Sequence, residues 1–434
     1  MVIYVVQPGD TLESIAREYG VPLSRLISQN ELDPAANLAV GQTIVILYPE
    51  QTYTVKNGDT LSGIADRYGV TINELLRNNP QLKGKPDIFE GQTLIISYDT
   101  EKLGDIAVNG YIYPFVDRDV LIQTLPYLTY LTLFTYGFTP DGRLVENGVQ
   151  TDFGMNEDEI INLSREYGTA PIMHLSTLGE DGLFNSELGN ILLNDPTVQD
   201  VLINNVIEKM KEKNYYGLDI DFEYLATENR DLYTTFLNRF SEALNENGFI
   251  LITALIPKAS ADQPGALYES HDYAGIGSVS DYVLLMTYEW GYAFGPPMAV
   301  APLNEVERVV RYAVSEIPTD KIFLGIPNYA YDWPLPYEKG KTKARSLSNV
   351  DAVNLAIETG STILFDEYMQ APYYFYNLDG VRHVVWFDDA RSIEEKLNLI
   401  AKYELYGASY WNVMKWFPQN WLVINSIYKI NKII

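Results

Sequence analysis

The chain has 434 residues, of which 47% are apolar and 21% charged, so it is long enough to form two or three globular units with a large core. Its net charge of −27 disfavours nucleic acid and anionic membranes as partners, because clustered lysines and arginines are what bind phosphate groups. The chain has no cysteine, which excludes disulfides, thiolate catalysis and cysteine-ligated metals. Its three histidines are scattered and form no zinc-hydrolase motif, so we expect neither a metal nor a cofactor.

The N-terminus lacks the features of an export signal. It reads Met-Val-Ile-Tyr-Val-Val and turns polar at Gln7, without the basic start and longer apolar core of a secretory signal. No run approaches the ~18–20 apolar residues of a membrane span. We therefore expect a protein made without a signal peptide. Its acidic charge favours a neutral polymer such as a polysaccharide as partner, and we expect a monomer.

The first hundred residues contain a repeat. The segment Tyr4–Leu12 is echoed by Tyr53–Leu61 with the shared pattern Y-x-V-x-x-G-D-T-L, and Gly41-Gln42-Thr43 is echoed by Gly91-Gln92-Thr93. Apolar residues then recur at the i, i+3, i+4, i+7 spacing of one helix face, from Leu12 and again from Leu61. Each copy is predicted to fold as strand–helix–helix–strand, with Asp10 and Asp59 able to cap the first helices. Thr71 and Glu74 have the spacing of a capping box.

This repeat resembles two LysM modules, over residues 1–49 and 50–99. The resemblance implies binding of N-acetylglucosamine units of peptidoglycan or chitin, in a groove between the loop before the first helix and the loop after the second. The glycan-binding residues that it implies are Gly9, Asp10, Thr11, Leu12 and Asn30 in the first module and Gly58, Asp59, Thr60, Leu61 and Asn79 in the second. Turn and cap chemistry alone also accounts for most of these residue types. Two linked copies are expected to strengthen binding by effective concentration.

Residues 100–434 alternate short β-rich apolar runs with longer helical stretches. The expected strands are Ala107–Tyr113, Tyr130–Tyr136, Ala170–Leu175, Gly217–Phe222, Phe249–Leu255, Tyr282–Thr287, Ile322–Ile326 and Ala408–Trp411. Eight such runs separated by helices predict an α/β fold, a (β/α)8 TIM barrel, in which chemistry belongs to the C-terminal ends of the strands.

The fourth run carries three carboxylates, Asp219, Asp221 and Glu223, at alternate positions. Side chains alternate along a strand, so all three face one side, while the intervening apolar residues face the surrounding helices. Crowded carboxylates on a buried strand are expected to raise at least one pKa and to titrate together. A polar edge strand or a metal site is the structural alternative, but a closed barrel has no edge strand.

This run resembles the D-G-x-D-x-D-x-E signature of glycoside hydrolase family 18, with Tyr216 in place of its first aspartate. The resemblance implies a retaining, substrate-assisted reaction, which is an exception to the scheme of two catalytic carboxylates. Glu223 would protonate the leaving oxygen, Asp221 would hold the substrate's acetamido group, and Asp219 would share a proton with Asp221. Tyr288 would donate a hydrogen bond to the acetamido oxygen.

Three further residues at strand ends are implied to contact substrate. Met286-Thr287-Tyr288-Glu289 resembles the family's M-x-Y-D, with Glu289 in place of aspartate; Tyr329 would line the cleft and Trp411 would form the floor under the −1 sugar. The family's S-x-G-G on the third strand is replaced by His174-Leu175-Ser176-Thr177.

Two segments near the C-terminus resemble those of one group within the family. Gln370-Ala371-Pro372-Tyr373 and Asp388-Asp389-Ala390-Arg391 look like those of LysM-plus-family-18 proteins of spore-forming bacteria, which include spore cortex-fragment-lytic N-acetylglucosaminidases. The resemblance implies an enzyme acting on cortex peptidoglycan and located in the spore, or alternatively in the cytoplasm. Two other functions stay open, a chitinase-like enzyme and a glycan-binding coat protein with an inactive barrel; the presence of all three acids favours an enzyme.

Overall fold

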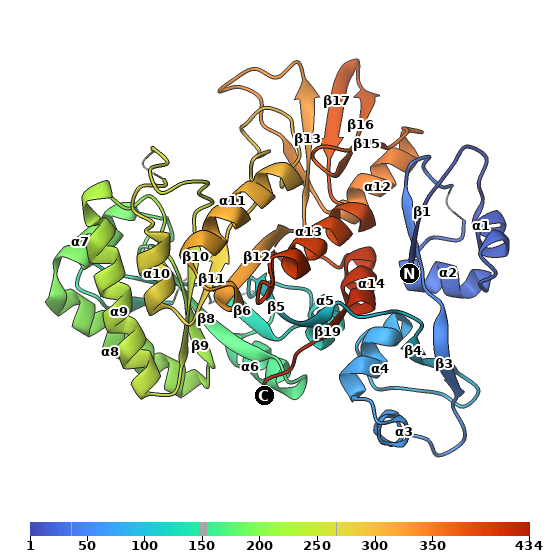
Figure 1. Ribbon diagram of the computed structural model, residues 1–434, viewed down its shortest axis with the longest axis horizontal. Coiled ribbons are helices and arrows are strands. Elements are labelled where there is room, and N and C mark those ends of the chain that lie inside the picture. The colour runs from blue at the N-terminus through green and yellow to red at the C-terminus, as the bar shows by residue number, and fades with distance from the viewer. Residues whose placement is uncertain (36, 147–148, 150–153, 266) are drawn as a thin grey trace.

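The chain forms two small N-terminal units, a large barrel and a small antiparallel sheet that stands on the barrel (Figure 1). The computed structural model describes residues 1–434 except 36, 147–148, 150–153 and 266. The predicted fold class, a (β/α)8 barrel preceded by two βααβ units, is confirmed.

Both N-terminal units have the predicted βααβ order. The first comprises β1 (Val2–Val5), α1 (Leu12–Glu18), α2 (Leu23–Asn30) and β2 (Thr43–Ile46), and the second comprises β3 (Pro49–Thr54), α3 (Leu61–Tyr68), α4 (Ile72–Asn78), the 3-10 turn η1 (Pro80–Leu82) and β4 (Thr93–Tyr98). The two strands of each unit pair antiparallel, and the periodic apolar face of each first helix packs into a core of its own.

Threonine, rather than the aspartate before it, caps the first helix of each unit. Thr11 accepts a hydrogen bond from the Ser14 amide, whereas Asp10 accepts from the Gln7 amide and the Tyr4 hydroxyl and closes the turn before the helix. Thr60 and Asp59 make the equivalent contacts in the second unit. The prediction that Asp10 and Asp59 cap these helices is therefore wrong, because the helix begins one residue later. The capping box predicted from Thr71 and Glu74 is confirmed.

Eight parallel strands close the barrel, and all eight predicted runs fall on them. They are β5 (Gly104–Ile112), β6 (Tyr130–Phe138), β8 (Ala170–Ser176), β9 (Gly217–Asp221), β10 (Ile250–Leu255), β11 (Tyr282–Leu285), β12 (Ile322–Pro327) and β18 (Gly407–Trp411). Pairing runs in chain order from β5 to β18, and β18 returns to β5. Two short strands extend this sheet, β7 (Leu144–Val145) beside β6 and β19 (Tyr428–Ile430) beside β5.

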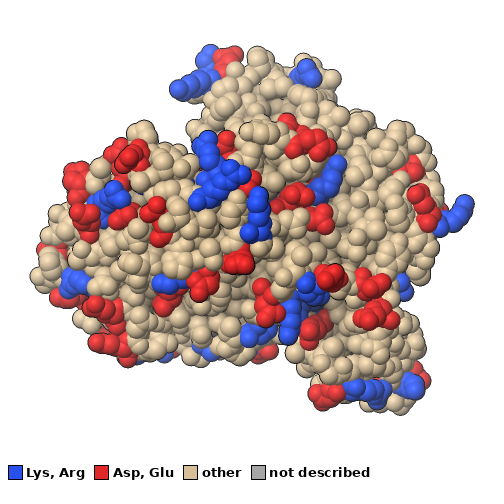
Figure 2. Space-filling view, in the orientation of Figure 1, with Lys and Arg blue, Asp and Glu red and all other residues tan. Residues whose placement is uncertain are grey.

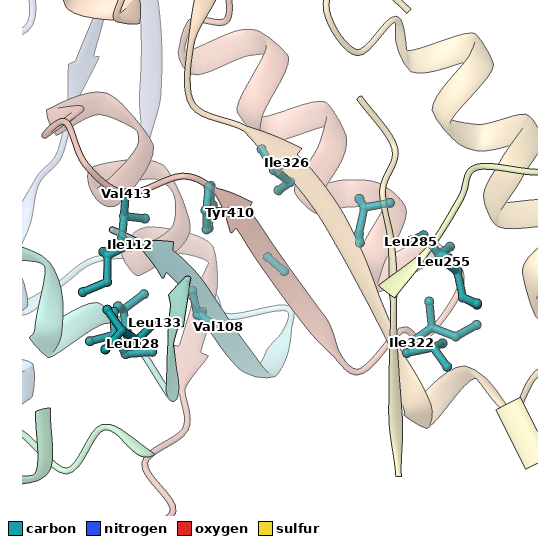
Figure 3. Close-up of a cluster of buried hydrophobic side chains, with 14 of the residues drawn as sticks. Val108, Ile112, Leu128, Leu133, Leu255, Leu285, Ile322, Ile326, Tyr410 and Val413 are labelled. Carbon is teal, nitrogen blue, oxygen red and sulfur yellow. The ribbon is translucent and has the colours of Figure 1, made fainter. Parts of the chain in front are cut away.

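Helices surround the strands and bury the main core against them. They are α5 (Arg118–Thr124), α6 (Glu157–Glu166), α7 (Ser186–Asn194), α8 (Pro196–Lys213), α9 (Arg230–Glu246), α10 (Tyr273–Val279), α11 (Leu303–Glu316), α13 (Ala390–Lys402) and α14 (Pro418–Ile427), with the 3-10 turns η2 (Leu125–Tyr127), η3 (Thr227–Asn229) and η4 (Thr319–Lys321). Figure 3 shows part of this core, where Val108, Leu285 and Ile326 of the strands lie among other buried apolar side chains. Burying this apolar surface is the main source of stability of the barrel.

An antiparallel sheet that the sequence did not predict is inserted after β12. It comprises β13 (Ala330–Leu335), β14 (Arg345–Leu347), β15 (Leu364–Asp366), β16 (Ala371–Leu378) and β17 (Val381–Trp386), with α12 (Asn349–Glu358) packed against it. It stands at the top of Figure 1, above the barrel. The sheet raises one wall beside the C-terminal ends of the barrel strands.

The N-terminal units pack against the barrel, at α14 and the chain around it (Figure 1). Arg77 of α4 is 4% exposed and donates to the Asn425 side chain and to the Pro126 carbonyl. Gln419 of the barrel exchanges hydrogen bonds with Thr43 of the first unit. These buried contacts hold the two units in a defined position relative to the barrel.

Candidate active site

The three carboxylates of β9 and the residues after it point to the interior and mouth of the barrel, as predicted. Asp219 is fully buried, Asp221 is 15% exposed and Glu223 is partly buried just beyond the strand. Leu218, together with Ile220 and Phe222, is buried against the helices. Alternation along one strand therefore stacks the acids from the barrel core outward.

Asp219 lies beneath the site. Its Oδ2 accepts a hydrogen bond of 2.5 Å from the Tyr111 hydroxyl on β5, and the His174 imidazole on β8 lies 3.9 Å away. Burial raises the pKa of Asp219 to about 6, against the opposing effects of His174 and Tyr111. Asp219 therefore changes its protonation state close to neutral pH.

Glu223 has the environment of a catalytic acid. Burial first, and then the charges of Asp221 and Glu289, raise the pKa of Glu223 to about 8. The side chain lines a cleft of about 510 Å³ together with Asp221, Tyr288 and Trp411. A carboxylic acid that is still protonated at pH 7 and faces a cleft can donate a proton to a bound oxygen.

Tyr288, which follows β11, and Trp411, the last residue of β18, both line this cleft. Burial raises the pKa of Tyr288 well above its ordinary value, so the hydroxyl remains a hydrogen-bond donor. The Trp411 ring packs edge-on against Tyr111 at 5.4 Å and Phe134 at 5.0 Å between ring centroids. These neighbours fix the indole so that it forms a flat apolar wall.

Glu289 lines the same cleft as Glu223, and Tyr329 lies beside that cleft. Glu289 adopts a left-handed backbone conformation with φ of 65°, and its Oε1 accepts a hydrogen bond of 3.3 Å from Tyr329. Burial raises the pKa of Glu289, although hydrogen bonds from Tyr329 and Tyr331 oppose the shift. Tyr329 lines a neighbouring hollow of about 560 Å³ under the inserted sheet rather than the central cleft.

The cleft continues in two directions. The hollow that holds Tyr329 contains Trp411 and Glu289 but not Glu223. A second hollow of about 460 Å³ contains Glu223, Tyr288 and Arg308 but not Trp411. The three cavities share Glu289 in their lining, and the central one carries both Glu223 and the aromatic wall of Trp411.

Several residues of the site escaped the sequence analysis. His174 contacts the acids from the neighbouring strand β8 and Tyr111 from β5, and Phe134, Phe184 and Ser176 line the cleft. The alternation of side chains on β5 and β8 predicts which residues point inward, so this signal was available for Tyr111 and His174. Phe184 lies in a loop and carries no such signal.

The predicted glycan-binding residues of the N-terminal units fall into two classes. Gly9 and Thr11, like Gly58 and Thr60, are exposed on the loop before the first helix, with Asp10 and Asp59 half-buried beside them. The other four are buried, namely Leu12, Leu61, Asn30 and Asn79.

The two buried asparagines stabilise their own modules. Asn79 donates to the carbonyls of Leu75 and Ile95 and accepts from the Ile95 amide, which ties the second helix to the closing strand. Asn30 makes the equivalent contacts in the first unit. With their polar atoms committed to the backbone, both amides have a structural role that the resemblance did not imply, and this geometry argues against the predicted direct contact with glycan.

The two units differ in whether the loop before the closing strand, at Gly41 or Gly91, contacts the barrel domain. A Cβ at Gly41 would lie 2.0 Å from the Ile363 carbonyl oxygen, and the Ile363 amide donates to Val40, so this loop is docked on the inserted part of the barrel. Gly91, its counterpart, has open space around it, and Phe89 beside it is 74% exposed. The two loops that border the predicted groove of the second unit meet where Asn57 donates to Glu90 at 3.4 Å.

Comparison with known families and structures identifies both parts of the chain. The model of "Glycosyl hydrolases family 18" matches residues 118–415, and the LysM domain model matches residues 4–47 and 53–97. The chain belongs to glycosyl hydrolase family 18. The predicted resemblance is therefore confirmed, and with it the prediction that the chain is a glycosidase carrying two LysM domains.

Similar proteins extend over the whole chain. It is 39% identical to the cortical fragment-lytic enzyme of Bacillus subtilis over 100% of this chain and 99% of the relative, and 35% identical to that of Bacillus anthracis over 99% of each. The crystal structure of the Bacillus cereus spore cortex-lytic enzyme SleL has a TM-score of 0.83 and 34% identity, covering 99% of this chain and 98% of that one.

The described part of the chain has neither a helix suited to span a membrane nor a side-chain cluster suited to hold a metal ion, and its surface carries charges of both signs (Figure 2). None of its helices is both long and apolar enough to cross a bilayer. Figure 2 shows acidic and basic side chains interspersed over the visible face. Within the residues that the structure describes, no group of three or more histidine, aspartate or glutamate side chains is arranged to hold a metal ion.

Proposed function

We propose that this protein is a peptidoglycan-binding N-acetylglucosaminidase that degrades spore cortex fragments by substrate-assisted, retaining catalysis. The single observation that carries the proposal is Glu223, whose pKa is raised to about 8 in a cleft walled by Trp411 and Tyr288. The names of its relatives, which are cortical fragment-lytic enzymes, support cortex peptidoglycan as the substrate. They also support a spore location, and we expect a monomer that does not bind nucleic acid.

The chemistry follows from the roles that these residues can fill. Glu223 donates its proton to the glycosidic oxygen, while the substrate's own 2-acetamido oxygen attacks the anomeric carbon and forms an oxazolinium ion. Asp221 accepts a hydrogen bond from the acetamido N–H and stabilises the cation; Tyr288 donates to the acetamido oxygen. Glu223, now a carboxylate, then removes a proton from the water that opens the ring.

The two hollows beside the central cleft differ in their lining, and this difference suggests which way the glycan chain is oriented when bound. The leaving group must lie beside Glu223, and the sugar whose glycosidic bond is broken must lie on Trp411. The hollow with Glu223 but without Trp411 therefore suits the leaving-group side, and the hollow with Trp411 but without Glu223 suits the non-reducing side. Arg308 on the leaving-group side can attract the carboxylates of a peptidoglycan fragment.

The LysM pair supplies docking in this proposal. The free loop of the second module, with Phe89 exposed, offers the more open groove. An aromatic ring suits the apolar face of a sugar, as Trp411 does in the cleft. The first module, docked through Val40 and Ile363, contributes mainly its exposed first loop.

A comparison of substrates tests the proposal. The full chain is incubated with purified cortex fragments and, separately, with N-acetylglucosamine oligomers, and the products are weighed by mass spectrometry. Cleavage of cortex fragments after N-acetylglucosamine is the expected result. Cleavage of the oligomers alone would favour the chitinase-like alternative, which is consistent with the 25% identity to a class V chitinase from Pseudomonas fluorescens. No hydrolysis of either substrate would favour a glycan-binding coat protein.

A further inference from the structure

His174 is a buried imidazole between two of the catalytic carboxylates. On β8 it pairs in register with Asp219 of β9, and its side chain is fully buried. Its Nε2 lies 3.8 Å from Asp221 Oδ2 and 3.9 Å from Asp219 Oδ2 and has no hydrogen-bond partner. A buried polar nitrogen without a partner is rare in folded proteins and indicates a role that a resting hydrogen-bond network does not satisfy.

The contacts of the other ring nitrogen, Nδ1, bear on which nitrogen of the imidazole carries the hydrogen. The Thr135 hydroxyl donates its only proton to the Tyr136 carbonyl at 3.0 Å. Its oxygen lies 2.6 Å from His174 Nδ1 and 2.8 Å from Ser176 Oγ, and in this arrangement it accepts from both. Nδ1 then carries the hydrogen, and a neutral His174 points the lone pair of Nε2 at two carboxylates; in the other tautomer Nε2 itself carries the hydrogen and points it at them.

Such an arrangement needs a further proton. An imidazole lone pair that lies within 4 Å of two carboxylate oxygens is repelled by them, unless a proton sits on Nε2 or on one of the carboxylates. Asp219 Oδ1 and Asp221 Oδ1 are also buried without a hydrogen-bond partner. Among the described residues, no lysine or arginine forms an ion pair with either aspartate, so His174 is the one group there that can bring positive charge to the pair.

We propose that His174 is a positioning residue that shares a proton through Nε2 with Asp219 and Asp221 and thereby sets the charge of Asp221 during the reaction. The proposal rests on the proposed function. The shared proton moves only between the ring nitrogen and a carboxylate oxygen, so no other bond is made or broken. His174 does not reach substrate, because it is fully buried and lies outside the set of residues that line the cleft.

The polar and titratable groups that face this cluster come from several elements of the barrel. They are Asp219 and Asp221 on β9, Tyr111 on β5, Thr135 on β6, Ser176 on β8, Tyr288 after β11, Glu223 after β9, Tyr233 on α9 and His271 before α10. Burial raises the pKa of the three tyrosines well above the ordinary value, so they stay neutral. Removing the imidazole leaves the two aspartates without the positive neighbour that His174 can supply, which favours their protonated forms.

Two substitutions in the full chain test the proposal, His174→Asn and His174→Gln. Asparagine keeps a polar group near Nδ1 and glutamine places an amide near Nε2, but neither titrates. We expect KM to change less than threefold, kcat to fall at least tenfold, and the acid limb of the pH profile of kcat/KM to move to higher pH by at least half a unit. His383→Asn is the matched control, because His383 pairs with Asp332 in the inserted sheet, away from the cleft; its acid limb should not move.

The readouts separate a positioning role from a structural one. A folded His174 variant with kcat within twofold of wild type and an unmoved acid limb would overturn the proposal. If neither variant folds, nitrogen NMR of the wild-type protein measures whether His174 Nε2 carries or shares a proton. The chain has three histidines, so the signals are simple to assign. A protonated or hydrogen-bonded Nε2 is expected at pH 5–8, and a bare lone pair throughout that range would refute the proposal. Failure of the proposed function is distinct, since wild-type protein would then leave cortex fragments uncleaved.

Discussion

Replacing Glu223 with glutamine removes the transferable proton and keeps the shape of the side chain. With a pKa of about 8, about nine-tenths of Glu223 is protonated at pH 7, compared with about 0.3% at its ordinary pKa of 4.5. The environment therefore increases the acid form by about 300-fold, which corresponds to about 3 kcal/mol. General acid catalysis contributes ~10²–10⁴-fold, and Glu223 serves both steps of the reaction, so we expect kcat/KM to fall by ~10⁴-fold.

The assay compares two substrates over a range of pH. A substrate with a strongly acidic phenol as leaving group needs little help from an acid, so glutamine should slow its glycosidic cleavage less than that of a cortex fragment. The wild-type kcat/KM should decline as pH rises through about 8, because Glu223 loses its proton there. Glu166→Gln, at the exposed end of α6, serves as the control and should match wild type. Activity of Glu223→Gln within threefold of wild type would refute the assignment of the acid.

Four other outcomes are expected. Because the folded-state pKa of Glu223 is raised from 4.5 to about 8, its contribution to stability is complete below about pH 4.5 and is lost as pH rises through 8, by at most about 5 kcal/mol. Thermal unfolding should therefore show a higher Tm for Glu223→Gln than for wild type at pH 9 and a smaller difference at pH 5; an equal difference at both would contradict this. Phe89→Ala should weaken pull-down on insoluble cortex several-fold without affecting hydrolysis of soluble oligosaccharides, whereas Tyr368→Ala, with a similar exposure of 73%, should change neither. A glycoside without the 2-acetamido group should be inert, and a thiazoline analogue of the oxazolinium ion should inhibit competitively and bind more tightly than product; a covalent adduct on Glu289 would show a different nucleophile. Chelation with EDTA should leave both hydrolysis and binding unchanged, and loss of either would reveal a metal.

The patterns that sequence analysis read correctly are local ones. The eight barrel strands were predictable because each is a short apolar run between helical segments, and the common orientation of Asp219, Asp221 and Glu223 because they alternate along one run. The LysM units were predictable from their repeat and their helix periodicity. Apart from the repeat itself, this information lies within about ten residues, where the 2.0 and 3.6 periods of strand and helix determine which side chains share a face.

Contacts between distant segments needed the tertiary structure. His174 meets Asp219 because β8 pairs with β9, and Tyr111 meets it because the closed barrel brings β5 to the same interior; Arg77 meets Asn425 across 348 positions of the chain. The fold also decided that Asn30 and Asn79, residue types equally suited to glycan contact, are used to tie helix to strand. The pKa values of Asp219 and Glu223 belong to the same class, because desolvation depends on everything packed around a carboxylate and not on its neighbours in the chain.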